Sequence, residues 1–110
     1  MQRFSQGEVN FIKIHSAPTD ATEIILPEGG RYIVGHSESG NLHVLDAEEV
    51  TLCRRPGADV LYAIVANPTQ LRQEKSDAPH APIPVDPGVY RIVISREFNP
   101  FMNEARRVAD

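Results

Sequence analysis

Four histidines and several carboxylates are the residues of this 110-residue chain whose chemistry could define a site. Neutral imidazole is the commonest side-chain ligand of metal ions. His36 and His43 lie on either side of a turn, and His80 follows Asp77 within a proline-rich segment. If these four residues converge, three nitrogens and one oxygen would suit Zn²⁺, Mn²⁺ or Fe²⁺. We therefore take His36, His43, His80 and Asp77 as the candidate metal ligands.

Other carboxylates could supply the oxygen, namely Glu38, Glu48 or Glu97. The alternative interpretation is that the histidines are exposed, or are hydrogen-bonded within strands. The chain has no compact metal motif such as HExxH and no glycine-rich phosphate loop. Cys53 has no flanking sequence typical of a nucleophile, so we expect it in the core. The chain shows no complete catalytic constellation.

The candidate site depends on a predicted hairpin over residues 31–46. Two apolar, partly β-branched runs flank a group of turn-forming residues there. One placement of the turn puts His36 directly opposite His43, with Cβ atoms about 4.5–5.5 Å apart. A turn centred on Gly40 and its neighbour instead pairs His43 with Glu38. The pairing of the two histidines is therefore a prediction about strand register.

Short apolar segments separated by glycine and proline turns recur along the chain. The predicted strands cover residues 9–15, 23–26, 32–34, 42–45, 50–54, 59–66 and 89–95, with 59–66 as a central strand. We expect one helical turn around Leu71, and an extended path for residues 78–88 along an edge. Six or seven short strands predict an all-β protein, either a small single-domain barrel or a two-sheet sandwich. Residues 1–8 and 101–110 are expected to be loose or peripheral.

Composition excludes several classes of function. The length suits one domain, and 41% hydrophobic with 24% charged residues is ordinary for a globular protein. The net charge of -4 argues against nucleic acid, because phosphate binding requires a basic face. No secretory signal is evident, and no apolar run approaches the ~20 residues that span a bilayer. A single cysteine cannot form an intrachain disulfide, so we expect a cytoplasmic protein.

Several segments resemble a group of small uncharacterised bacterial and phage proteins. These segments are GHSESGNLHV at 35–44, HAPIPVDPGVYR at 80–91, REFNP at 96–100 and RRVAD at 106–110. The corresponding motifs of the group are GH(S/T)xxGxxH, HEEHxPIxxPxGxY, QREYxP and a closing RRVxD. The resemblance implies that the histidines belong together, although Asn41 and the segment 77–80 depart from the pattern. It implies a bacterial or phage-infected cell as the location, leaves virion association open, and implies no activity.

The chain also shows a partial resemblance to cupins. Gly35, Asn41, His43 and Glu48 stand at the spacing of the first cupin motif, with Asn41 in the place of its first histidine. Arg91 stands where the second motif would have a histidine. This resemblance implies a β-barrel with an incomplete set of ligands.

Two functions follow from these patterns. We expect a binding or structural module of phage derivation rather than an enzyme, able to form homo-oligomers through an exposed edge strand. The alternative is a metal-binding, cupin-like protein that uses a histidine cluster for chemistry on a small molecule. The sequence does not identify that small molecule.

Overall fold

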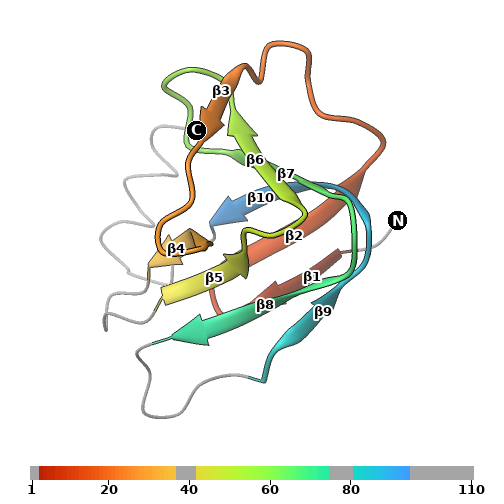
Figure 1. The fold of residues 1–110 in the computed structure, drawn as a ribbon. Coiled ribbons are helices and arrows are strands. Elements are labelled where there is room, and N and C mark those ends of the chain that lie inside the picture. The colour runs from red at the N-terminus through yellow and green to blue at the C-terminus, as the bar shows by residue number, and fades with distance from the viewer. Residues whose placement is uncertain (1–2, 37–41, 75–80, 95–110) are drawn as a thin grey trace, which may run out of the picture.

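The computed structural model describes residues 3–36, 42–74 and 81–94, which form ten strands and no helix. The strands are β1 (Arg3–Gln6), β2 (Val9–Ile14), β3 (Glu23–Ile25), β4 (Arg31–His36), β5 (Leu42–Asp46), β6 (Val50–Arg54), β7 (Leu61–Val65), β8 (Thr69–Glu74), β9 (Ile83–Val85) and β10 (Gly88–Ile94). A six-stranded sheet has the order β1-β2-β10-β7-β6-β3, and a four-stranded sheet has the order β4-β5-β8-β9 (Figure 1). All pairings are antiparallel, and the two sheets form an open sandwich rather than a closed barrel.

The core lies between the two sheets and follows the alternation of side chains along each strand. In β10, Tyr90 and Ile92 are buried, whereas the intervening Arg91 is exposed. The ring of Phe11 stacks on Phe4 with centroids 4.9 Å apart, and Tyr90 packs 5.8 Å from both rings. Full burial of each large apolar side chain stabilises the fold by about 1.5–3 kcal/mol. This aromatic group therefore anchors β1 and β2 to the centre of the six-stranded sheet.

The chain crosses from one sheet to the other through a tight turn between β5 and β6. The Ala47 N–H donates to the carbonyl of Gly30, and the Val50 N–H donates to the carbonyl of Ala47. Glu49 has a φ of 67°, a left-handed conformation that residues other than glycine seldom adopt. Its carbonyl nevertheless accepts a hydrogen bond from Ala66, at the end of β7. These bonds hold the crossing in one conformation.

Hydrogen bonds from Arg55 hold the connection between β2 and β3 against the outer face of the six-stranded sheet. Nε of Arg55 donates to both carboxylate oxygens of Asp20 at 2.9 Å, and Nη1 donates to the Tyr62 hydroxyl at 3.2 Å. Tyr62 and its cross-strand neighbour Cys53 are both buried. Burial raises the pKa of the Cys53 thiol, which disfavours the nucleophilic thiolate. Cys53 is therefore buried, as the sequence predicts, but on the face of the sheet opposite to Val50 and Leu52, which belong to the core between the sheets.

The all-β prediction is confirmed, and of its two alternatives the sandwich is correct. The predicted strands are present, β7 is central, and the proline-rich segment contributes the edge strand β9. The predicted helical turn around Leu71 is wrong, because Leu71 lies in β8 and points into the core. Residues 1–8 are expected to be loose or peripheral, and residues 3–6 instead form β1, which lies at a sheet edge, pairs with β2 and buries Gln6 to 2% exposure. These two strands and β9 raise the count to ten.

The predicted tail at 101–110 lies outside the described residues. Within the described residues, no helix is long and apolar enough to cross a membrane.

Candidate functional site

The predicted opposition of His36 and His43 is wrong, because a β-bulge shifts the register of the hairpin. Beyond this irregularity β4 and β5 pair Gly35 with His43 and His36 with Leu42, which differs from both predicted registers. Neighbouring residues of a strand point to opposite faces of the sheet. His36 is accordingly exposed, whereas His43 is fully buried on the core side. The two imidazoles therefore point away from each other.

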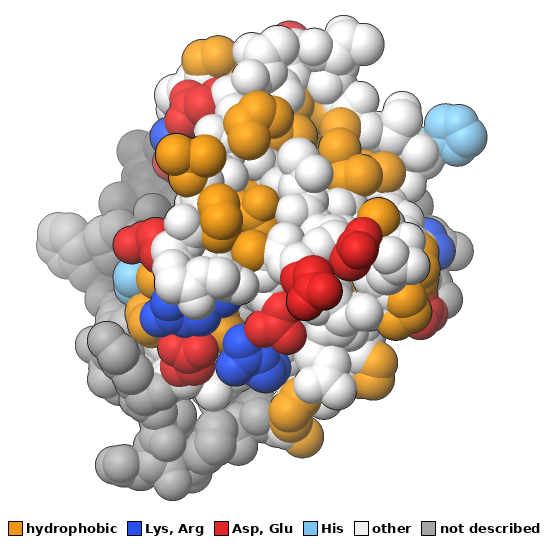
Figure 2. Space-filling model, viewed as in Figure 1, with side chains coloured by type: hydrophobic (Ala, Val, Ile, Leu, Met, Phe, Trp, Pro, Cys, Tyr) orange, Lys and Arg blue, Asp and Glu red, His pale blue; other side chains and the backbone are white. Residues whose placement is uncertain are grey.

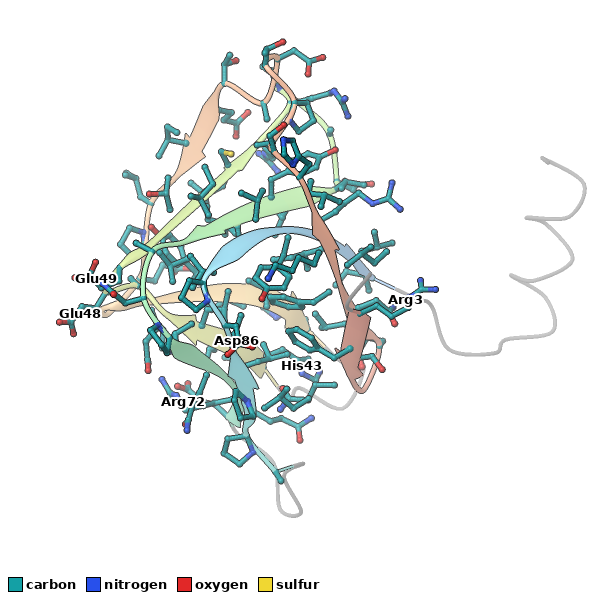
Figure 3. The ribbon with its side chains drawn as sticks, turned by 90° about the vertical axis from the view of Figure 1, so that its right-hand side faces the viewer. Arg3, His43, Glu48, Glu49, Arg72 and Asp86 are labelled. Atoms are coloured by element: carbon teal, nitrogen blue, oxygen red, sulfur yellow. The ribbon has the colours of Figure 1, made fainter. Side chains whose placement is uncertain are left out.

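His43 is enclosed by the turn that joins β1 to β2, in the interior of the sandwich (Figure 3). Its Nδ1 lies 3.0 Å from Oε1 of Gln6, and its Nε2 lies 3.3 Å from Oε1 of Glu8. A Cβ atom on Gly7 would lie 3.1 Å from Cε1 of the ring, and one on Gly35 would lie 3.5 Å from Cδ2. The imidazole thus fills a narrow space between the β1–β2 turn and β4, with a glycine on each side.

The amide of Gln6 determines which nitrogen of His43 carries a proton. Nε2 of Gln6 donates to the carbonyl oxygens of Leu71 and Ala81, each at 3.2 Å, so the amide oxygen is the atom that faces His43. Nδ1 of His43 must therefore be protonated and donate to that oxygen. Nε2 then faces the carboxylate of Glu8, where a proton or a metal cation between the two atoms would make the contact attractive. Through these hydrogen bonds, Gln6 connects β1 of one sheet to β5 and β8 of the other.

A groove opens beside β4 and has a volume of about 520 Å³. It is lined by Ile33, Val34, Gly35, His36, Asp59, Val60, Val93 and Ile94. β4 contributes one wall, and the end of β10 together with the residues before β7 contributes the other. Most of the lining residues are apolar by type, but polar atoms, including those of the exposed His36 and Asp59, make up about half of the lining surface. A concave surface that combines apolar side chains with polar groups is typical of a binding site.

Among the described strands, β4 is the longest of the four that lie at a sheet edge. It has six residues and no proline, whereas β1 has four residues and β3 has three. β9 also has three residues, and Pro84 at its centre has no N–H to donate. Short strands and prolines are the means by which proteins prevent pairing at an edge. Of the four edges, β4 is therefore the best template for an additional strand.

The main-chain groups of Ile33 point towards this open edge. The Gly30 carbonyl accepts a hydrogen bond from the residue after β5, whereas Arg31 exchanges two hydrogen bonds with Glu28 on the other side. Successive residues of an antiparallel strand alternate between the two sides. Tyr32 therefore faces β5, and the N–H and C=O of Ile33 face outward. Among the described residues, β4 pairs only with β5 and, at Arg31, with Glu28.

Charged side chains cover the outer face of the four-stranded sheet, where Figure 2 shows basic and acidic groups side by side. Arg31 pairs with Glu74 at 3.1 Å, and Arg72 pairs with both Glu74 and Asp46. Each of these side chains is at least a quarter exposed. Exposed ion pairs contribute at most about 1 kcal/mol each. This network is a solvated surface whose charges are already paired.

A family model for a domain of unknown function, DUF8820, matches residues 5–95. The chain belongs to the DUF8820 family. The matched range of this DUF8820 domain begins within β1 and ends just after β10, so it includes both the His43 group and the groove. Neither a search of curated proteins nor a search of solved structures gives a match.

Two of the four predicted metal ligands of this DUF8820 domain, His36 and His43, lie among the described residues. Asp77 and His80 lie outside the described residues, as do the alternative oxygen donors Glu38 and Glu97. Glu48 is exposed in the turn after β5, away from the buried interior that holds His43. Within the described ranges, no group of three or more His, Cys, Asp or Glu side chains could hold a metal ion. The four-ligand set stays a prediction.

Three residues that contact His43 or line the groove beside β4 were not predicted from the sequence. Gln6 and Glu8 belong to a segment expected to be loose, where Gly7 between polar residues was the only signal of a hairpin turn. Asp59 begins a run predicted to be a buried strand, but it precedes β7 and lines the groove. Each of these contacts joins residues that lie far apart in the chain.

Proposed function

We propose that this DUF8820 domain is a non-catalytic binding module that accepts an extended segment of another polypeptide as a strand added to β4. The observation that supports this proposal is the open edge of β4, whose outward main-chain groups begin at Ile33 and border a groove lined by apolar side chains together with His36 and Asp59. In strand addition, main-chain hydrogen bonds provide affinity and pockets for alternate side chains provide specificity. β4 offers the first of these features, and the groove offers the second.

The dimensions of the site define what fits. With respect to the described residues, the edge that remains open runs from Ile33 to His36, because the main chain of Glu28 already covers Arg31. A strand of this length places about two side chains on one face. Small β-branched side chains on that face would contact the apolar lining at Val60 and Val93. A second copy of the chain is one polypeptide that could supply such a strand, which would give a homo-oligomer.

A display library of random short peptides tests this function with Ile33→Pro as the decisive variant. Proline removes an N–H that makes no bond to β5, so the variant should fold while the added strand loses a partner. Ile33→Thr is the matched control, because it shortens the side chain and retains the N–H. We expect wild type and Ile33→Thr to enrich common peptides that Ile33→Pro fails to bind. Equal enrichment by a folded Ile33→Pro would refute the proposal.

A second measurement does not depend on the folding of that variant. Synthetic versions of one enriched peptide are methylated at single backbone nitrogens. Only alternate amides of an added strand bond to the template. We expect methylation at one alternate set to abolish binding and methylation at the other set to be tolerated. Sedimentation velocity would identify a second copy as the partner if wild type is a dimer and Ile33→Pro is a monomer.

A second candidate function is metal binding at His43, and the position of Glu8 favours it. Metal-bound histidines commonly donate their other ring N–H to a fixed acceptor, as Nδ1 of His43 does to Gln6. Gln6 also bonds to Ala81, the residue that follows the predicted ligand His80. Metal content after purification without an affinity tag tests this function. Stoichiometric metal that is lost in His43→Gln supports it, and metal-free wild type with an unchanged melting temperature in Zn²⁺, Mn²⁺ or Fe²⁺ rejects it.

A further inference from the structure

Asp59 gives the groove a defined charge. It is the one acidic side chain among the described residues that line the groove, and it is exposed. No ion pair joins Asp59 to any other described residue, in contrast to Asp20, Asp46, Glu23 and Glu74. The rest of the lining is apolar apart from His36 and Gly35. In the described part of the groove, a ligand would therefore meet a single carboxylate beside the apolar side chains of Val60 and Ile94.

We propose that the segment bound at β4 carries a lysine or arginine that pairs with Asp59. This inference rests on the proposed strand addition and specifies the chemistry of the partner. A cation at this position would form a charge-assisted hydrogen bond with the carboxylate. The aliphatic stem of a lysine or arginine could at the same time cover the neighbouring Val60 and Ile94. An acidic segment would be repelled, both by Asp59 and by the net charge of -4.

The size of the effect follows from the exposure of Asp59. Exposed ion pairs contribute roughly 0.2–1 kcal/mol, which corresponds to a change in affinity of about 1.4- to fivefold. Charges at the rim of an interface act mainly on the association rate and on its dependence on salt. Asp59 is therefore expected to select among apolar segments rather than to supply most of the affinity.

The test uses the random peptide library itself as the probe, with wild type, Asp59→Asn and Asp86→Asn as baits. Asp86→Asn is the matched control, because Asp86 precedes β10 whereas the groove lies at the opposite end of that strand. We expect the wild-type and Asp86→Asn pools to be enriched in lysine and arginine at one position, and the Asp59→Asn pool to lack this preference. A synthetic peptide from the wild-type pool should bind Asp59→Asn about 1.4- to fivefold more weakly at low salt, and equally at high salt.

Two results would overturn this inference, and they have different meanings. If all three baits enrich peptides with the same content of lysine and arginine, the partner carries no cation for Asp59, although strand addition stands. If wild type enriches no peptides, the proposed function fails and this inference fails with it.

Discussion

Oε1 of Gln6 accepts a hydrogen bond from Nδ1 of His43 at 3.0 Å, and this contact joins the edge strand of one sheet to the interior of the other. The same amide donates to the carbonyls of Leu71 and Ala81. Gln6→Ala would remove the partner of three polar groups. Each buried polar group left without its partner costs about 1–3 kcal/mol. We expect the free energy of unfolding to fall by about 2–4 kcal/mol, measured by urea denaturation.

Gln70→Ala is the matched control for this change, because Gln70 lies in β8 with its side chain exposed. Its effect should stay within about 0.5 kcal/mol. Equal effects of the two substitutions would mean that the Gln6–His43 contact does not support the fold.

Gly35 permits a close approach between the two sheets. A Cβ atom on Gly35 would lie 2.5 Å from Cγ2 of Val9 on β2. We expect Gly35→Ala to destabilise the protein by about 1–3 kcal/mol, as overpacked cores do. Val9→Ala removes the methyl group that clashes, so the same substitution should cost less in a Val9→Ala background. A double-mutant cycle by urea unfolding measures this coupling, and strictly additive effects would contradict the close approach.

Replacing Glu49 by glycine is predicted to stabilise the folded protein. Its φ of 67° is unfavourable for a residue with a Cβ atom, whereas glycine adopts it readily. We expect Glu49→Gly to raise the free energy of unfolding by about 0.5–1 kcal/mol. Glu48→Gly removes the same charge at the adjacent exposed position, and it should not stabilise. Thermal unfolding of the two variants makes the comparison, and equal shifts would assign the effect to charge rather than to backbone conformation.

Tyr90 should make stability decrease at alkaline pH. Its burial, and secondarily the negative charge of Asp86, raise the pKa of the Tyr90 hydroxyl. The unfolded chain therefore loses the tyrosine proton before the folded protein does. The stabilisation is complete below the ordinary tyrosine pKa of about 10 and is lost as pH rises through the higher folded value.

The comparison of Tyr90→Phe with wild type tests this linkage. Urea unfolding at about pH 8 to 11 should show a shallower decline for Tyr90→Phe. Tyr62→Phe is the control, because it removes a tyrosine and retains Tyr90. An unchanged slope in Tyr90→Phe would show that other groups cause the alkaline loss.

Local patterns account for most of the fold. The alternation in residues 9–15 and 89–95 and the turns rich in glycine and proline predict strands, because both signals act over a few residues. β8 was missed because its sequence, TQLRQE, has one strongly apolar residue, and Leu71 is made a core residue by strands from elsewhere in the chain. β1 was missed for the same reason, since Gln6 finds its partners far along the sequence.

The site was harder to predict, because it depends on register. A bulge beside Val34 places His36 and His43 on opposite faces, and a pattern of residue types cannot locate a single inserted residue. The open edge of β4 likewise depends on the strand order. β4 is the outermost strand of its sheet, with β5 on one side and no described strand on the other. Asp59 lines the same groove as Val93 and Ile94 at the end of β10, although these residues lie far apart in the sequence.

Amide hydrogen exchange at Ile33 and Tyr32, in the presence of a peptide enriched by the wild-type domain, tests strand addition to β4 most directly. The Ile33 N–H points to the open edge, and the Tyr32 N–H points to β5. We predict that the peptide slows exchange at Ile33 strongly and changes exchange at Tyr32 little. Binding of the peptide with no added protection at Ile33 would contradict the account.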